Sequence, residues 1–241
     1  MNKRLIVISI FLLMLASHAK AAGGVPILIY HSIDEFTGHG SRELYVSPAN
    51  FEKQMLYLKK NGFTLLSFEN WQDRTKVKKP IFITIDDGYK NNLNVEAIFQ
   101  KIKDRQFVPK ATLFVISDFI CRPNRLSTTE LKRLADSGMF SIQSHTANHP
   151  DLRKTKNLQV ELKSSKETIE QITNKPVIAI SYPFGIYNEK ILNETKKYYP
   201  FGLTTIPEKF KEHGKANELL LLPRIYVKYS TSMNEFANLV N

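Results

Sequence analysis

Two adjacent carboxylates, Asp86 and Asp87, are the side chains most clearly placed to do chemistry. They follow the apolar run 81–85 and precede Gly88, so they fall where a predicted buried strand ends in a turn. Like charges a few ångströms apart raise one pKa unless a cation or hydrogen-bond donors offset them. The pair therefore favours a metal site, although a polar turn that only closes a strand would have the same sequence.

Two imidazoles, His145 and His149, are four residues apart and follow another short strand, predicted at 140–144. On a helix or in a tight turn this spacing puts both rings on one face, within reach of one cation. Alone, such a pair could equally be two ordinary structural histidines. Joined to a carboxylate, the histidines would form a site with an open position for water, which is typical of catalytic zinc.

The elements that would position these residues alternate along the chain. Apolar runs predict strands at 25–30, 64–68, 81–85, 111–116, 140–144, 177–182, 201–205 and 219–227. Periodic apolar positions and capping residues predict helices at about 48–61, 95–102, 128–137, 158–172, 189–198 and 233–240. This alternation indicates βαβ units and a parallel sheet, in either a barrel or a doubly wound fold.

A barrel is the preferred α/β architecture. No Gly-x-Gly-x-x-Gly motif follows the first strand, which removes the main support for a dinucleotide-binding fold. The site of a barrel lies at the carboxyl ends of its strands. His31, both aspartates, His145 and the Pro183-Phe184 segment all fall at such ends.

Residues 1–21 are predicted to be a signal peptide. Lys3 and Arg4 form a basic start, residues 5–15 an apolar core, and Ala19-Lys20-Ala21 the small-x-small pattern that precedes cleavage. The core is too short to span a bilayer comfortably, and no later stretch approaches about 18 apolar residues. We therefore expect an exported protein, either periplasmic or secreted to the cell surface, with no integral membrane span after cleavage near Ala21.

The composition of the 241-residue chain bounds its partners. It has 34 Lys and Arg against 23 Asp and Glu, a formal net charge of +11. Export argues against a nucleic-acid partner, and the lysines are scattered over predicted helix faces as on an ordinary solvated surface. Cys121 is the only cysteine, so no intramolecular disulfide can form and stability must come from an apolar core. We expect a monomer.

Three segments resemble the motifs of the polysaccharide deacetylase family, also called the NodB-homology domain or carbohydrate esterase family 4. They are Thr84-Ile85-Asp86-Asp87-Gly88, His145-Thr146-Ala147-Asn148-His149 and Ser181-Tyr182-Pro183-Phe184-Gly185, in the family's order and approximate spacing. Segments 26–31, 51–62 and 222–225 look most like the branch that deacetylates exported poly-β-1,6-N-acetylglucosamine. The resemblance covers nearly all of residues 22–241.

The resemblance implies a distorted (β/α)7-type barrel in a single domain and a divalent metal, usually zinc, with cobalt or nickel as alternatives. Carried over by position, Asp87, His145 and His149 would bind the metal, and Asp86 would be the general base. This division would explain the paired acids. The cation would hold one carboxylate ionised, while the other would accept a proton from water.

The implied reaction is removal of N-acetyl groups from a glycan. Attack on the acetamide carbonyl creates an oxyanion, which the family pattern assigns to the backbone amide of Phe184, with Pro183 and Tyr182 in the same substrate-binding segment. The leaving sugar amine then needs a proton from a general acid.

This sequence departs from the commoner family pattern at two positions. Ser181 or its neighbours stand where an arginine usually orients the base, and Leu222-Pro223-Arg224 replaces the late Leu-x-His that usually supplies the acid. We expect Arg224 to orient Asp86 and His31 to act as the acid, since a histidine can do this near neutral pH. His31 could instead be a hydrogen-bonded structural residue.

Other readings of the same residues stay open. A glycosidase using Asp86 and a distant acid would need no metal and would shorten chains. A carbohydrate-binding barrel without turnover would fit the two departures from the family pattern. Among deacetylase substrates, peptidoglycan, chitin oligosaccharides and acetylated xylan suit the chemistry as well as poly-β-1,6-N-acetylglucosamine does.

Overall fold

The computed structural model describes residues 24–241, so the predicted signal peptide lies outside the described residues. Within them, the main sheet has eight strands and every strand pair is parallel. The strand order is β10-β1-β5-β6-β7-β8-β9, with β4 also beside β5. The strands are β1 (Ile27–Tyr30), β4 (Thr64–Leu66), β5 (Pro80–Ile85), β6 (Ala111–Val115), β7 (Phe140–Ser144), β8 (Ala179–Ser181), β9 (Phe201–Leu203) and β10 (Ile225–Tyr226).

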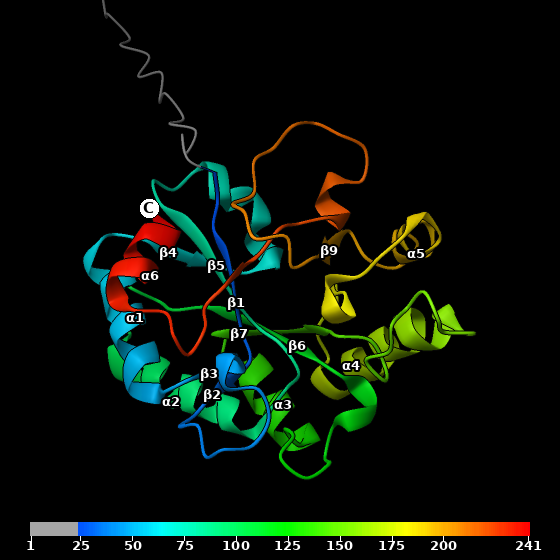
Figure 1. Ribbon diagram of the computed structural model, residues 1–241, viewed down its shortest axis with the longest axis horizontal. Helices are drawn as coiled ribbons and strands as arrows, with labels where there is room; N and C mark the ends of the chain where they lie inside the picture. The colour runs from blue at the N-terminus through cyan, green and yellow to red at the C-terminus, as the bar shows by residue number, and fades with distance from the viewer. Residues whose placement is uncertain (1–23) are drawn as a thin grey trace, which may run out of the picture.

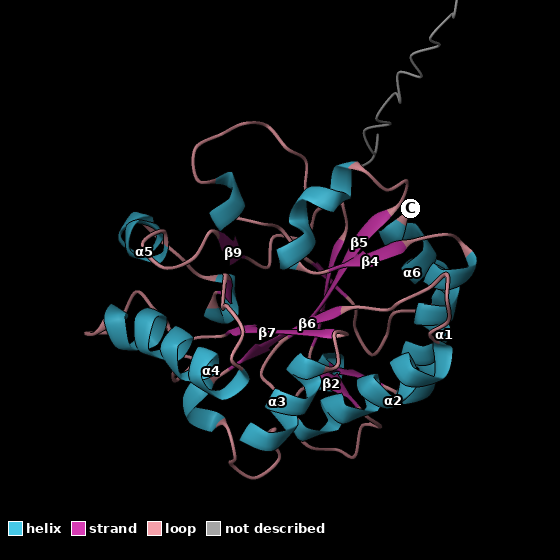
Figure 2. Cartoon of the chain, turned by 180° about the vertical axis from the view of Figure 1, so that it is seen from behind, coloured by secondary structure: helices cyan, strands magenta, loops and turns pink. Residues whose placement is uncertain are grey.

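The sheet is curled, and helices cover its outer side (Figure 1; Figure 2). A parallel bridge between Leu203 and Leu222 brings β9 next to the chain that leads into β10, although these strands stand at opposite ends of the strand order. The predicted single-domain barrel is therefore confirmed as a parallel sheet curled into a half-barrel. The helices are α1 (Pro48–Lys60), α2 (Leu93–Ile102), α3 (Thr128–Asp136), α4 (Ser165–Thr173), α5 (Glu189–Thr195) and α6 (Met233–Val240).

Side chains alternate between the outside and the inside of the curled sheet, as the pleat of a strand requires. On β5 the outward set packs in the core beneath the helices and consists of Ile81, Ile83 and Ile85. The inward set consists of Phe82, which packs in a separate aromatic cluster, followed by Thr84 and Asp86, which both contact Arg224. The interior therefore changes from apolar to polar along one strand.

The predicted helix starts are confirmed. The Ser47 side chain caps α1, with Pro48 in the first turn. Capping boxes begin α3 at Ser127 and α6 at Ser232, and Asn188 caps α5. The described residues contain no helix with the length and apolar character needed to cross a membrane.

Two stretches differ from the prediction. The strand expected over 219–227 is wrong in its first half, because Asn217 adopts a left-handed φ of 62° and begins the 3-10 turn Glu218–Leu220. Residues 34–46, for which no helix or strand is predicted, contain a 3-10 turn, Arg42–Leu44, and the strand β3 (Tyr45–Val46), which pairs with β2 (Ser32–Ile33).

Candidate active site

Asp87, His145 and His149 meet at the carboxyl ends of β5 and β7. One ligand atom from each residue lies within 4.8 Å of the other two. His145 Nε2 is 3.6 Å from Asp87 Oδ1, and His149 Nε2 is 4.0 Å from the same oxygen. Two imidazole nitrogens and one carboxylate oxygen form a donor set that suits a divalent ion such as zinc. The structure thus brings together the three residues predicted to bind a metal.

Left-handed backbone conformations direct two of these side chains. Asp86 points inward by the alternation of β5, so Asp87 would point outward if the strand continued. Instead Asp87 has a φ of 72° and Gly88 a φ of 65°, and the turn brings the second carboxylate back to the histidines. His149 has a φ of 57°. Such values are strained for residues other than glycine and persist only where the surrounding fold holds them.

The orientation of His145 is determined by a backbone carbonyl. Its Nδ1 lies 2.8 Å from the Ser181 carbonyl oxygen, which can only accept a hydrogen bond. Nδ1 therefore carries the proton, and Nε2 presents a free lone pair toward Asp87, as in metal-binding histidines. Burial lowers the pKa of His145 despite the neighbouring Asp86 and Asp87 carboxylates, so the ring is neutral at pH 7.

Asp86 is held by a guanidinium from the far end of the chain. Arg224 is fully buried and donates from Nη1 to Asp86 Oδ1 and from Nη2 to Asp86 Oδ2, both at 2.8 Å. Ser181 Oγ donates to Asp86 Oδ2 at 3.0 Å and accepts from Arg224 Nη2 at 2.7 Å. The paired contact fixes the plane of the carboxylate. This geometry is the one expected if Arg224 orients Asp86.

The charge of Asp86 follows from the same contacts. Burial by itself would raise the pKa of the Asp86 carboxyl, but the Arg224 guanidinium and the nearby His145 hold that pKa well below its usual range. The carboxylate is therefore ionised at neutral pH. An ionised, oriented carboxylate beside a candidate metal site is what a general base requires.

A comparison with known families agrees with this geometry. The family model for polysaccharide deacetylase matches residues 73–200, which is more than half of the chain. The chain belongs to the polysaccharide deacetylase family. The matched range contains both aspartates, both histidines and the segment around Phe184.

Three relatives show how far the similarity to other polysaccharide deacetylase sequences extends. The crystal structure of BC0361, a polysaccharide deacetylase from Bacillus cereus, is 51% identical, with a TM-score of 0.89 over 90% of this chain and 69% of that chain. YxkH of Bacillus subtilis is 34% identical over 76% of this chain. Poly-β-1,6-N-acetyl-D-glucosamine N-deacetylase of Staphylococcus aureus is 28% identical over 63% of it. The chain spans 65% and 58% of the lengths of the last two.

His31, the candidate acid of this member of the family, lies at the end of β1. Its ring stacks on Tyr226 with a centroid separation of 5.5 Å and an interplanar angle of 9°. Its carbonyl accepts a hydrogen bond from Asn92 Nδ2 at 2.7 Å. Burial lowers the pKa of His31, against the opposing effect of the Asp86 and Asp87 carboxylates. Without bound substrate, the His31 ring is therefore neutral at pH 7.

The predicted oxyanion and substrate segment divides into a buried and an exposed part. Tyr182 is fully buried in the main core and Pro183 is also buried, so neither ring lines an open site, contrary to the prediction that both belong to the substrate-binding segment. The reason is the alternation of β8, which directs Tyr182 outward beneath the helices. Phe184 is 61% exposed, has a left-handed φ of 59°, and places its ring 4.7 Å from that of His149.

Several residues of the site were not predicted from the sequence. Asn92 and Tyr226 position His31, and Arg125 donates from Nη1 to the Asp87 carbonyl at 2.9 Å. Glu161 binds the loop between the two histidines. Their only sequence signal is a polar or aromatic side chain near an expected strand end or on an expected buried helix face, which many surface residues share.

Proposed function

We propose that this member of the polysaccharide deacetylase family is a metal-dependent enzyme that removes N-acetyl groups from an exported N-acetylglucosamine polymer. Poly-β-1,6-N-acetylglucosamine is the first candidate substrate. The observation that carries the proposal is the convergence of Asp87, His145 and His149 beside Asp86, whose carboxylate is fixed by Arg224. A relative that is 28% identical is named for that substrate, which supports the candidate.

The residues present fit a divalent ion. Asp87 offers a carboxylate oxygen, and His145 presents an unprotonated Nε2. The left-handed conformations of Asp87 and His149 bring their side chains to the same point as His145. Zinc is the first expectation for this donor set, with cobalt or nickel as alternatives. Bound there, such an ion would act as a Lewis acid and would lower the pKa of a coordinated water.

The side chains around this point can carry the remaining steps. Asp86, ionised and held by Arg224, takes a proton from the attacking water. The backbone amide of Phe184 donates to the oxygen that develops negative charge on the acetamide carbonyl. His31 delivers a proton to the leaving sugar amine, and the products are acetate and a free amine. Since His31 is neutral in the free chain, it must gain a proton before or during each turnover.

Acetate release from defined polymers tests the proposal. The panel contains poly-β-1,6-N-acetylglucosamine, peptidoglycan, chitin oligosaccharides and acetylated xylan, each with and without a chelator. We expect acetate from the first polymer, loss of release with the chelator, and recovery with zinc, cobalt or nickel. Asp86→Asn is the matched negative control, because it keeps the shape of the side chain but cannot act as a general base. We expect its rate of acetate release to be about 10²–10⁴-fold lower than that of the wild type.

Two outcomes would reject the proposal. Shortened chains without acetate would indicate a glycosidase. Glycan binding without acetate, with every metal and every polymer, would indicate a binding barrel. Acetate from another member of the panel would keep the deacetylase and change its substrate.

Export is a separate part of the proposal. It is supported by the basic start, the apolar core and the Ala-x-Ala pattern of residues 1–21. The amino-terminal sequence of the protein recovered from culture medium or cell envelope should begin near Ala22. A cytoplasmic protein that keeps Met1 would reject this part alone.

A further inference from the structure

The loop between the two candidate metal ligands, residues 145–149, has no regular secondary structure. Thr146 and His149 both have left-handed φ values, 67° and 57°. Its two ligands are held differently. His145 is fixed through its own ring by the Ser181 carbonyl, whereas the His149 ring has no hydrogen bond to any described residue and contacts only the rings of His145 and Phe184 among the aromatic pairs. The position of His149 therefore depends on the backbone of its loop.

Neighbouring groups hold that backbone from two sides. The carbonyls of Thr146 and Ala147 accept hydrogen bonds from the backbone amides of Ser117 and Asp118, at 3.1 and 3.0 Å. The backbone amides of Ala147 and Asn148 donate to a single carboxylate oxygen, Glu161 Oε2, at 3.0 and 2.9 Å. The Asn148 side chain donates to the other oxygen, Oε1, at 3.3 Å. One glutamate thus accepts three hydrogen bonds from two consecutive loop residues.

The burial of Glu161 is unusual for a charged side chain. It is only 5% exposed, and it lies on the buried stripe of its helix with Ser165, Ile169 and Thr173. The turn that carries it, Val160–Ser164, is π-helical, a local widening of a helix that is frequent at functional sites. Burying a carboxylate is costly unless hydrogen bonds replace its water. Here the replacement donors all come from the loop that carries the candidate metal ligands.

We propose that Glu161 is a positioning residue of the metal site, which holds the 145–149 loop so that His149 Nε2 stays within reach of the ion bound by Asp87 and His145. The inference rests on the metal site of the proposed function. It assigns to Glu161 no contact with the ion or the substrate. Its effect on the ion passes through the backbone amides of Ala147 and Asn148.

The test is the metal affinity of Glu161→Gln. Glutamine has the shape of glutamate, so packing is kept, but one of its two terminal groups can no longer accept from the loop. The dissociation constants for Co²⁺ and Zn²⁺ are measured by competition with a chromophoric chelator, and the cobalt absorption spectrum is recorded. We expect affinity to fall about 10-fold, the lower end for residues that support metal ligands, because the neutral glutamine oxygen accepts more weakly than a carboxylate, and the cobalt spectrum to change. The matched control is Glu167→Gln on the same helix, whose exposed side chain lies 3.6 Å from Lys163 and which should bind both ions like the wild type.

Two further measurements keep the inference testable if Glu161→Gln does not fold. In the metal-free wild type, the amides of Ala147 and Asn148 should exchange hydrogen more slowly than exposed loop amides. Asn148 is exposed, and Asn148→Ala removes only the 3.3 Å hydrogen bond from its side chain to Glu161 Oε1. This variant should weaken cobalt binding about threefold.

Wild-type affinity in Glu161→Gln, or free exchange of the two amides, would overturn the role of Glu161. If the wild type itself binds neither ion, the proposed metal-dependent function fails as well, and the two failures are distinguishable.

Discussion

The two ends of the barrel interior use the same inward strand positions for different purposes. At the amino ends the interior holds an apolar cluster rich in aromatic rings, with centroid separations of 5.2 Å between Trp71 and Phe82 and 5.3 Å between Trp71 and Phe201. At the carboxyl ends it is filled by hydrogen-bonded polar groups centred on Arg224. The rings at the amino ends are held by packing, and the polar side chains beside them, Ser141 and Gln143, bond to each other and to Glu69. At the carboxyl ends each buried polar group must likewise be paired to offset its lost hydration.

Strained backbone is also present at the site end. Among the described residues, four non-glycine positions with left-handed φ lie at or beside the candidate site: Asp87, Thr146, His149 and Phe184. Strained positions of this kind persist because the rest of the fold stabilises them. The site end therefore combines buried polar groups with strained backbone, and both depend on the packing of the rest of the fold.

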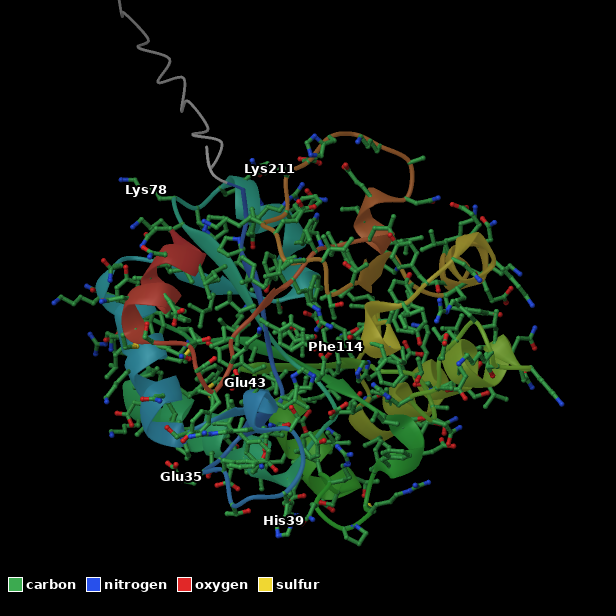
Figure 3. All side chains as sticks on the ribbon, viewed as in Figure 1. Glu35, His39, Glu43, Lys78, Phe114 and Lys211 are labelled. Carbon is green, nitrogen blue, oxygen red and sulfur yellow. The ribbon has the colours of Figure 1, made fainter. Side chains whose placement is uncertain are left out.

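The boundary between the ends is visible in the molecule. The Arg224 guanidinium lies 5.7 Å over the ring of Phe114. Figure 3 shows Phe114 near the centre, with Lys78 and Lys211 toward the amino ends and Glu43 and His39 toward the opposite side. The Phe114 ring therefore lies where the aromatic cluster meets the polar groups around Arg224.

The largest expected effect at the site end is that of Asp87→Asn. The variant keeps the shape of the side chain and a residue type that tolerates a φ of 72°. We expect kcat/KM for acetate release to fall about 10³-fold, because a ligand of the activating ion is lost. The free energy of unfolding should stay within about 1 kcal/mol of the wild type. A large loss of stability would show that the site end does contribute to stability.

The opposite pattern is expected at the aromatic end for Trp71→Ala. Removing a ring that packs on Phe82, Phe201 and Phe210 should lower the free energy of unfolding by about 3–5 kcal/mol. Below the unfolding transition, kcat should remain within about twofold of the wild type, since none of these rings touches the site. Chemical denaturation and initial rates measure the two quantities. A tenfold fall in kcat of the folded variant would contradict the separation of the two ends.

A smaller effect is expected from Phe184→Gly, which removes an exposed ring and a strained conformation together. Glycine adopts a φ of 59° freely, so the variant should be more stable by about 1 kcal/mol. The KM for the glycan should rise several-fold while kcat changes little, because the ring next to His149 is lost as a contact surface. Thermal unfolding and a substrate titration measure both. A variant less stable than the wild type would show that the strain at Phe184 is not released.

The smallest expected effect is at the rim of the site, with Glu130→Gln. Glu130 accepts from the Ser127 amide at 2.8 Å and pairs with Lys90 at 2.6 Å, which ties the chain after Asp87 to α3. Burial alone would raise the pKa of Glu130, but these partners lower it from 4.5 to about 2. The stability it contributes is therefore present above pH 4.5 and lost as the pH falls through about 2.

At pH 7 Glu130→Gln should be less stable than the wild type by about 1 kcal/mol, the usual cost of a lost helix cap. The difference should shrink as the pH falls below 4.5 toward 2, because the wild-type carboxyl then becomes neutral as well. The matched control is Glu235→Gln in the capping box of α6, which has no such ion pair among the described residues. A difference that is constant from pH 7 to pH 2 would contradict the assigned pKa.

The sequence predicts those parts of the fold that depend on neighbouring residues. The period of two places Phe82, Thr84 and Asp86 on one face, and Gly88 permits the turn that brings Asp87 back. The capping box at Ser127 marks the start of α3 to the residue. These features can be predicted from the sequence because each one depends on interactions between residues only a few positions apart.

Features that depend on how distant elements dock are much harder to predict. The helical period places Glu161 on the buried face and Glu167 on the exposed face, but it does not indicate that Glu161 binds the 145–149 loop, because that contact depends on how the helix docks. Arg224 is expected to orient Asp86 because the third motif lacks the arginine usual in the family, and not because of its spacing from Asp86. Tyr182 was assigned to the site because it adjoins Phe184, although the pleat of β8 directs it into the core.

The link between Asp86 and Arg224 spans 138 positions of the chain. A ribosome completes the segment containing Asp86 well before it adds β10, and domains are built from their amino end during synthesis. Until β10 docks beside β1, the carboxylate has no guanidinium to fix its plane. The nascent polypeptide therefore lacks this ion pair, and the candidate site is complete only when the last strand pairs with β1.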